Sequence, residues 1–456
     1  MKAYPYQERA VARMWQVMMQ SRARSLLLVS PTGSGKTVVA AKFIRRALRQ
    51  RKRIVFVAHT AQIIDQTYET LLACGVPEFR IGVLMAADER IEGHADRKRD
   101  GAPIQICGIA TLARRDLAPR ADVVIVDEAH HAEANSYKTL IGCYPRARIF
   151  GLTATPARAD RKPMRDTFGA LYVIATPTQL IKARRLADPV VYSAGAGSKG
   201  MALLDAQLKG VRRGAHDYNQ KQLGQAMNHR VLVGNIIKEW KRLGEGRRTV
   251  VFASGIAHSK AIVARFKAAG VAAEHIDGEM NAKDPNKVAR ILERLDSGEL
   301  TVVSNYAVLA EGWDQPSVKC IVLARPTRSL TTYLQMTGRS SRPYKGQRPI
   351  VLDHAGNCWR HSLPFIDREW SLDAPPKADG DAPLKSCSEC EAVIAAGHKE
   401  CPECGHAFPR VETPQEIEER LVKVERDALR RRIEDLAAKR GFSQKWVQNV
   451  AAMAGA

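Results

Sequence analysis

The sequence lacks any apolar segment long enough to cross a membrane. No stretch approaches the ~18 consecutive apolar residues of a spanning helix, and the first fifteen residues, MKAYPYQERAVARMW, hold no apolar core of signal-peptide length. Acidic residues are also comparatively few, because 48 Asp and Glu stand against 71 Lys and Arg, a net charge of +23. We therefore expect a protein with no membrane association, and the excess of positive charge favours a polyanionic partner such as nucleic acid.

Cysteine is too scarce and too unevenly placed for a disulfide framework. Five of the nine cysteines stand alone, and the other four form two CxxC pairs, Cys387 with Cys390 and Cys401 with Cys404. Each CxxC turn can offer two thiolates to one ion, and four thiolates complete a tetrahedron around Zn²⁺. We predict a closed structural zinc site, with a redox dithiol as the alternative.

Short β-branched runs alternate with longer helical stretches over most of the chain, which predicts an α/β fold with parallel sheets covered on both faces. The pattern stops and then restarts, so we expect two such units. The strands expected in the first unit are 25–29, 54–58, 104–108, 123–126 and 149–153, and those in the second are 249–253, 301–304, 320–323 and 349–352.

Changes in composition suggest the domain boundaries. Apolar periodicity is weak around 192–222, and 373–385 is rich in Pro, Gly and Asp, as linkers are. Apolar residues at three- and four-residue steps over 413–441 predict an amphipathic helix that packs on its own chain or binds a partner. We expect an α/β domain at 1–188, an interdomain connection at 189–228, a second α/β domain at 229–371, a linker at 372–385, a zinc ribbon at 386–409 and a helical tail at 410–456.

A phosphate-binding loop follows the first predicted strand. The segment SPTGSGKT places Pro31, Thr32, Gly33, Ser34 and Gly35 before Lys36 and Thr37. The two glycines allow the loop backbone to turn its N–H groups toward phosphate oxygens. Lys36 can then reach the β- and γ-phosphates of ATP, and the Thr37 hydroxyl can bind Mg²⁺. Ser30 stands where the strict form of this motif has its first glycine, but the order of strand, loop and helix is retained.

A second part of the same site is predicted at the end of the strand 123–126. Asp127 follows this strand, where a carboxylate for Mg²⁺ is needed, and Glu128 beside it is suited to orient and polarise the attacking water. An acidic pair at a strand end can be an ordinary turn, but the phosphate loop upstream makes the catalytic interpretation the better one.

These motifs resemble those of superfamily-2 helicases. SPTGSGKT, DEAH (127–130) and LTATP (152–156) occur in the family's order, and VVFASGIAHS, NYAVLAEGWDQP and QMTGRSSR (335–342) resemble its motifs IV, V and VI. The likeness covers about residues 1–355. Within the family the chain looks most like RadD-type bacterial or phage DEAH-box DNA helicases, which it resembles in the stretch LDHAGN (352–357) and in a cysteine-rich module after the motor.

The resemblance implies two tandem RecA-like lobes with ATP between them, followed by the zinc ribbon and the helical tail. It also implies roles for particular residues. Gln7 would read the adenine edge, and Arg339 and Arg342 would be arginine fingers in a motif VI that begins at Gln335. Gly312 and Asp314 of motif V, with Thr153 and Thr155 of motif III, would link the nucleotide to the nucleic-acid surface.

The function implied is that of an ATP-dependent DNA helicase or translocase in the cytoplasm of a bacterial or phage-infected cell. Its partner would be single-stranded or branched DNA in repair, recombination or replication, and the zinc ribbon or the C-terminal helix could bind a further protein. The alternatives are an RNA helicase with the same motor, the motor subunit of a restriction system, and a nucleic-acid-binding scaffold with a weak ATPase.

Overall fold

A computed structural model describes most of the chain. The described residues are 3–20, 24–85, 97–112, 118–131, 135–157, 163–195, 198–214, 217–244, 246–310, 312–373, 377–378, 383–408, 429–438 and 440–453. They form two compact units, residues 1–397 and 398–456. Within the described ranges, none of the helices has both the length and the apolar character that crossing a membrane requires.

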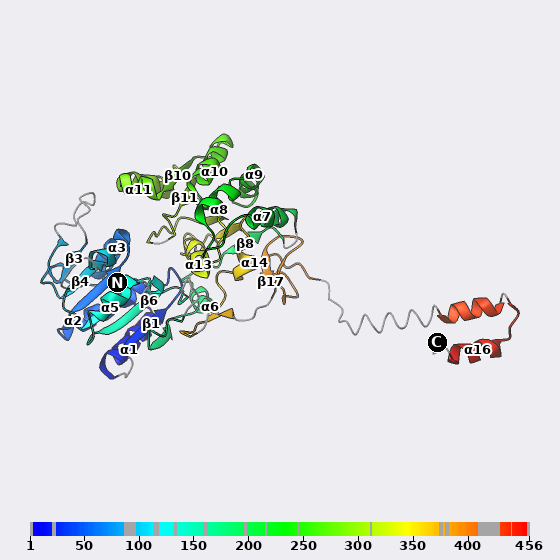
Figure 1. The fold of residues 1–456 in the computed structure, drawn as a ribbon, viewed down its shortest axis with the longest axis horizontal. Helices are drawn as coiled ribbons and strands as arrows, with labels where there is room; N and C mark the ends of the chain where they lie inside the picture. Colours follow the sequence, from blue (N-terminus) through cyan, green and yellow to red (C-terminus); the bar gives the residue numbers. More distant parts are fainter. Residues whose placement is uncertain are drawn as a thin grey trace. The chain divides into compact units, whose positions relative to one another are not determined.

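The first lobe is a seven-stranded parallel sheet of order β3-β4-β2-β5-β6-β1-β7, drawn in blue to cyan in Figure 1. Its central strands consist of buried apolar residues, as expected when helices cover both faces of a sheet. The strands are β1 (Ser25–Val29), β2 (Ile54–Ala58), β3 (Ile81–Leu84), β4 (Ile104–Gly108), β5 (Val123–Val126), β6 (Arg148–Thr153) and β7 (Ala170–Val173). The helices are α1 (Pro5–Gln20), α2 (Lys36–Arg49), α3 (Ala61–Ala73), α4 (Ile109–Leu112), α5 (Asn135–Gly142) and α6 (Pro177–Lys182).

The second lobe is a six-stranded parallel sheet of order β10-β11-β9-β12-β13-β8, in green to yellow in Figure 1. Its strands are β8 (Val190–Ser193), β9 (Thr249–Ala253), β10 (Ala273–Asp277), β11 (Val302–Tyr306), β12 (Cys320–Ala324) and β13 (Ile350–Asp353). Its helices are α7 (Lys199–Lys209), α8 (Gln220–Met227), α9 (Arg230–Glu239), α10 (Ile256–Ala268), α11 (Gly278–Lys283), α12 (Pro285–Ser297), α13 (Leu330–Gly338) and α14 (Asn357–His361). The predicted two-unit α/β architecture is confirmed, and all nine predicted strands are present within two residues of their expected ends.

The segment 189–228, for which we expected an interdomain connection with some helix near its end, also contributes to the second sheet. It contains β8, which pairs in parallel with β13 as an edge strand of the second sheet, and it also contains α7 and α8. β8 is only four residues long and is mostly half-buried, so its apolar run is too short to be distinguished from a loop in the sequence.

After the second lobe the chain returns to the first along residues 363–373, which we call the returning segment. Phe365 packs against one face of the first lobe's core, and Trp370 and Leu372 pack against the other. The Leu372 carbonyl accepts a hydrogen bond from the Met164 N–H at 2.7 Å. A short antiparallel pair follows, between β14 (Arg368–Glu369) and β15 (Lys377–Ala378). The two lobes are therefore joined by a second chain crossing in addition to the one that leads from α6 to β8.

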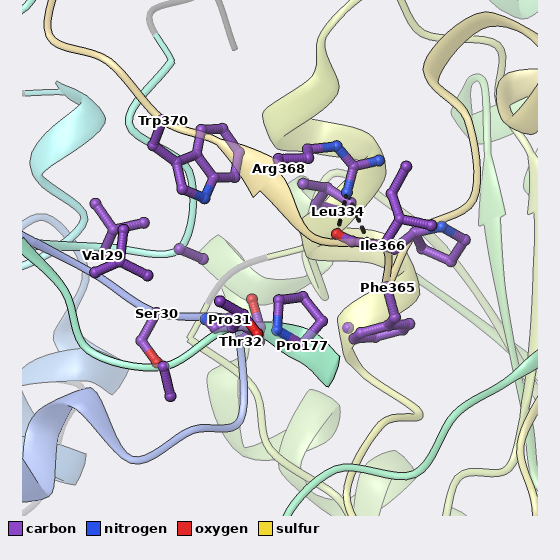
Figure 2. A pocket seen from close by; sticks show the side chains of 16 residues that line it. Val29, Ser30, Pro31, Thr32, Pro177, Leu334, Phe365, Ile366, Arg368 and Trp370 are labelled. Atoms are coloured by element: carbon purple, nitrogen blue, oxygen red, sulfur yellow. Dashed lines mark hydrogen bonds between the residues drawn. The ribbon is translucent and has the colours of Figure 1, made fainter. Parts of the chain in front are cut away.

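A narrow pocket lies between the returning segment and the phosphate loop (Figure 2). Pro31 and Thr32 of the loop line it together with Leu334 of α13 and Phe365. The Arg368 guanidinium donates hydrogen bonds to four carbonyls of residues 361–366, which holds the turn of the segment. The pocket volume is about 40 Å³, room for roughly one or two water molecules, so the lobes are closely packed behind the loop.

The first cysteine turn lies against the second lobe. β16 (Leu384–Ser386) pairs with β17 (Val393–Ala395), Ala392 bridges to Tyr192 of β8, and Val393 belongs to the second lobe's core. In the second unit, α16 (Gln444–Met453) follows a helical stretch at 429–438. Residues 413–428 of the predicted tail helix, and half of the predicted linker 372–385, lie outside the described residues.

Candidate nucleotide site between the lobes

The sheet register brings the predicted motifs of the first lobe to one edge. Val29 of β1 lies opposite Thr153 of β6, and Val57 of β2 lies opposite Val126 of β5. The loops that follow these strands therefore begin side by side at the carboxyl edge, where ligands bind in open parallel sheets. The phosphate loop, the acidic pair and motif III meet there.

The phosphate loop owes its shape to its two glycines. Gly33 and Gly35 have φ values of +88° and +81°, a region that L side chains rarely adopt. A Cβ atom at Gly35 would also lie 2.6 Å from the Gln7 amide nitrogen. The Ser30 and Ser34 hydroxyls are buried and have no hydrogen-bond partner within the described part of the chain, which suits a loop built to receive oxygen atoms from a ligand.

Lys36 extends beneath this loop, and its Nζ donates to the Ser30 carbonyl at 3.2 Å. Burial lowers the pKa of this ammonium from its ordinary value, and the nearby carboxylates of Glu128 and Asp127 partly oppose that shift. A lysine beside a glycine-containing loop at the start of a helix is an arrangement that stabilises a polyphosphate.

Asp127 and Glu128 lie at the end of β5 as predicted. Asp127 is 7% exposed, and burial, followed by repulsion from Glu128, raises the pKa of its carboxyl to about 7. Glu128 has a φ of +44° and lies 3.3 Å from the His130 ring nitrogen. The same His130 nitrogen lies 3.3 Å from the Thr153 hydroxyl, which accepts from the Thr155 N–H at 3.1 Å. The acidic pair and motif III are thus joined by a short chain of contacts.

The donor set at this edge suits a divalent cation. Oxygen ligands from a carboxylate and a hydroxyl are those that Mg²⁺ prefers, and Asp127 at the end of β5 and Thr37 in the first turn of α2 are residues of this kind. Burial and repulsion from Glu128 disfavour the charged form of the Asp127 carboxyl, and a bound cation would favour that form.

Arg342 of the second lobe reaches the phosphate loop of the first. Its Nη1 donates to the Gly33 carbonyl at 2.9 Å, while Nε and Nη2 bind both oxygens of Asp314 at 3.1 and 2.9 Å. The backbones also approach closely here, because a Cβ atom at Gly338 would lie 2.8 Å from the Thr32 Cβ. Asp314 therefore aims a guanidinium from one lobe at the loop of the other.

Arg339 has different surroundings from those that the resemblance implied. Its guanidinium donates to the carbonyls of Ala310 and Trp313, which lie in the motif V loop of its own lobe. Its positive charge still lowers the pKa of Lys36, after the larger effects of burial and Arg342. Gln335, also in motif VI, is 3% exposed, and its amide nitrogen has no partner within the described residues. The finger role of Arg339 remains a prediction, with Arg342 in the better position for it.

The Gln7 side chain binds the phosphate loop itself. Its amide nitrogen donates to the Ser34 carbonyl at 3.3 Å, and its amide oxygen accepts from the Tyr4 N–H at 3.0 Å. Tyr6 supports the same carbonyl through its hydroxyl at 2.8 Å. Arg185, which sequence reasoning missed, lies over the Tyr4 ring at 3.7 Å. A cation–π pair made by residues 181 positions apart leaves no local signal in the sequence.

Motif V meets the first lobe at Gly312. This glycine has a φ of +74°, and a Cβ atom there would lie 3.2 Å from the Gln62 side-chain oxygen and 3.4 Å from the Thr60 hydroxyl. Gln66 of α3 donates to the Gly312 carbonyl. A second interlobe contact is thus built around a position that only glycine fits. Trp313 beside it is buried in the second lobe's core.

The four paired cysteines come together. Their sulfur atoms all lie within 4.8 Å of one another, and Cys387 and Cys401 are buried. Each pair begins a tight turn, in which Glu391 N–H donates to the Cys387 carbonyl and Gly405 N–H donates to the Cys401 carbonyl. Four thiols at this spacing fit a tetrahedral metal site and are unsuited to octahedral Mg²⁺.

Comparisons with known proteins agree with this arrangement. Residues 1–158 match the family model of the type III restriction enzyme res subunit, and residues 230–343 match the helicase conserved C-terminal domain. A 51.5 kDa protein of a Lactococcus phage is 26% identical over 89% of this chain and 84% of its own length. The EcoAI type I restriction endonuclease subunit of Escherichia coli is 24% identical over 82% of this chain, but the match spans only 47% of that subunit.

A solved structure shows the same fold. The ATP-dependent type ISP restriction-modification enzyme LlaBIII, whose structure was determined bound to DNA, aligns with a TM-score of 0.57 at 16% identity, over 77% of this chain and 27% of that enzyme. The two family models occur in the order of the two lobes, and the motifs of both lobes meet at the phosphate loop. The chain therefore belongs to the superfamily-2 helicases, a family whose members hydrolyse ATP.

Proposed function

We propose that this chain uses ATP hydrolysis to move along DNA, or to unwind it, in repair, recombination or replication. The observation that supports this most is the contact of Arg342 with the phosphate loop, because it ties the nucleotide to the distance between the lobes. Lys36 and the loop N–H groups hold the phosphates, Glu128 orients the attacking water, and Arg342 neutralises charge on the γ-phosphate as the bond to it breaks.

Thr37 and Asp127 would hold Mg²⁺, which supplies positive charge that neutralises the β- and γ-phosphate oxygens. When hydrolysis removes the γ-phosphate, Arg342 loses that partner and the lobes can separate. The second set of interlobe contacts, between Gly312 and α3, would then change, and with it the contacts of the lobes with the nucleic acid.

DNA as the partner is supported by the net charge of +23 and by the DNA-bound restriction enzyme with the same fold. We propose single-stranded or branched DNA, in the cytoplasm of a bacterial or phage-infected cell, as the phage relative suggests. The similarity to restriction-enzyme subunits supports an ATP-driven motor of the same kind in this chain. We propose the zinc ribbon or the tail as the place where a protein partner binds.

The test is ATP turnover with single-stranded DNA, duplex DNA, and RNA, followed by strand displacement on forked duplexes. We expect single-stranded DNA to stimulate turnover at least ~10-fold, and the stimulation to fall steeply with salt because backbone contacts dominate. Stronger stimulation by RNA would favour the RNA helicase. Tight binding of nucleic acid without any stimulation would favour the scaffold.

We also propose that the four cysteines hold one structural Zn²⁺. Metal analysis of protein purified without chelators should find one zinc per chain, and Cys401→Ser should lose the metal and lower the melting temperature, because zinc binding contributes directly to folding. Zinc-free protein with an unchanged melting temperature would contradict this assignment. Cys143→Ser, at an exposed cysteine outside the cluster, is the matched control.

A further inference from the structure

A buried lysine lies beneath the loop that carries Arg342. Lys319 directly precedes β12 and is 0% exposed. Its main chain is fixed by two neighbouring strands, because its N–H donates to the Arg248 carbonyl and its carbonyl accepts from the Ile350 N–H at 2.9 Å. The base of the side chain therefore cannot move without disturbing the sheet.

The ammonium of Lys319 binds the main chain of motif VI. Its Nζ donates to the Ser340 carbonyl at 3.1 Å and to the Arg342 carbonyl at 2.5 Å. The carbonyl between them, that of Ser341, accepts from the Ala187 N–H at 2.7 Å. Three consecutive carbonyls are thus held, the outer two by one side chain of the second lobe and the middle one by the segment that connects the lobes.

The chemistry of this site requires a long side chain with several donors. An ammonium has three N–H groups and no acceptor, so it can bind two carbonyls at once. The cost is a buried charge, and burial lowers the pKa of Lys319 to about 8. The nearby charged and titratable groups do not neutralise it, since the Tyr344 ring lies 6.0 Å away and Arg248 donates to the Tyr344 hydroxyl. An apolar residue would fill this space without that cost, so stability alone does not explain a lysine here.

We propose that Lys319 is a positioning residue for ATP hydrolysis, which holds the motif VI backbone so that Arg342 points at the phosphate loop. Asp314 orients the guanidinium end of Arg342, and Lys319 fixes the main-chain end. A shift of about 1 Å in that main chain is enough to reduce turnover strongly, because transition-state contacts depend on exact geometry. This inference rests on the nucleotide site proposed above.

The test is a double-mutant cycle between Lys319 and Arg342, with ATP turnover and ATP affinity measured for each variant. Lys319→Met keeps the volume of the side chain and removes its donors. We expect a loss of turnover of at least ~10-fold with ATP affinity changed less than ~2-fold. In the Arg342→Ala background, Lys319→Met should reduce turnover less than ~2-fold further, because the residue it positions is gone.

Several outcomes are decisive. Independent, multiplied losses in the double variant would show that Lys319 acts only on stability or by another route, and would overturn the inference. An unchanged turnover in Lys319→Met would do the same. If Arg342→Ala itself has no effect, the nucleotide site fails rather than the positioning role alone. Lys319→Arg, which keeps the positive charge and several N–H donors, should recover part of the turnover, and exposed Lys267→Met on α10 should behave as wild type.

If Lys319→Met does not fold, as judged by its thermal unfolding curve, the same cycle is measured with Lys319→Gln. That variant keeps one donor group and shortens the reach, so its loss of turnover should again vanish in the Arg342→Ala background. A loss that persists there at full size would contradict the positioning role.

Discussion

Replacing Lys36 with alanine is expected to lower ATP turnover by at least ~10²-fold. The Lys36 side chain is half-buried, and its ammonium lies close enough to Asp127 and Glu128 for their carboxylates to favour its charged form. Its removal leaves the phosphate loop without a cation just where phosphate charge increases during the reaction. Binding of DNA should be largely retained, because the contacts to the DNA phosphate backbone are expected from basic surfaces outside this loop.

The measurement is steady-state ATP hydrolysis together with binding of labelled single-stranded DNA at a fixed salt concentration. Arg49→Ala, an exposed change in the last turn of the same helix, is the control and should leave both quantities near wild type. Turnover by Lys36→Ala at the wild-type rate would reject the phosphate-site assignment.

The sequence predicted the interior of both sheets but missed every edge. The four strands of these two sheets that it did not predict are β3, β7, β8 and β10, and these are their four edges. An edge strand that is covered less completely than a central one does not need a continuous apolar run, whereas β3 is buried throughout but is only four residues long. β7 is half-buried throughout, and β10 carries Glu274 and His275 between its buried ends. Interior strands are recognisable because burial on both faces favours near-continuous apolar runs, although buried polar residues such as Gln105 and Asn305 occur within them.

The site shows the same division between local and distant determinants. The glycine loop and the acidic pair are contiguous in sequence, and their chemistry could be recognised without a structure. Arg185, Lys319 and the returning segment could not be recognised, because each acts on residues that are close only in the folded chain. Arg339 illustrates the limit of motif reasoning, since two arginines of one motif have different partners in the fold.

Replacing Arg342 with alanine is expected to reduce ATP turnover by ~10³–10⁵-fold, the range for loss of an arginine finger. The physical reason is that a planar guanidinium can contact two γ-phosphate oxygens, whose charge grows only as the bond breaks. Binding of ATP before that moment depends on the phosphate loop, so affinity should change little. Arg348→Ala is the matched control, because Arg348 lies in the same loop and makes a surface ion pair with Asp188.

The most direct test of the account is therefore a comparison of two quantities for the Arg342→Ala protein: the maximal rate of ATP hydrolysis with DNA present, and the equilibrium dissociation constant for ATP. If both lobes build one catalytic site, the rate collapses while the dissociation constant stays within about threefold of wild type. A rate that survives the substitution, or a rate and an affinity that fall by the same factor, would contradict the claim that the second lobe completes the reaction centre of the first.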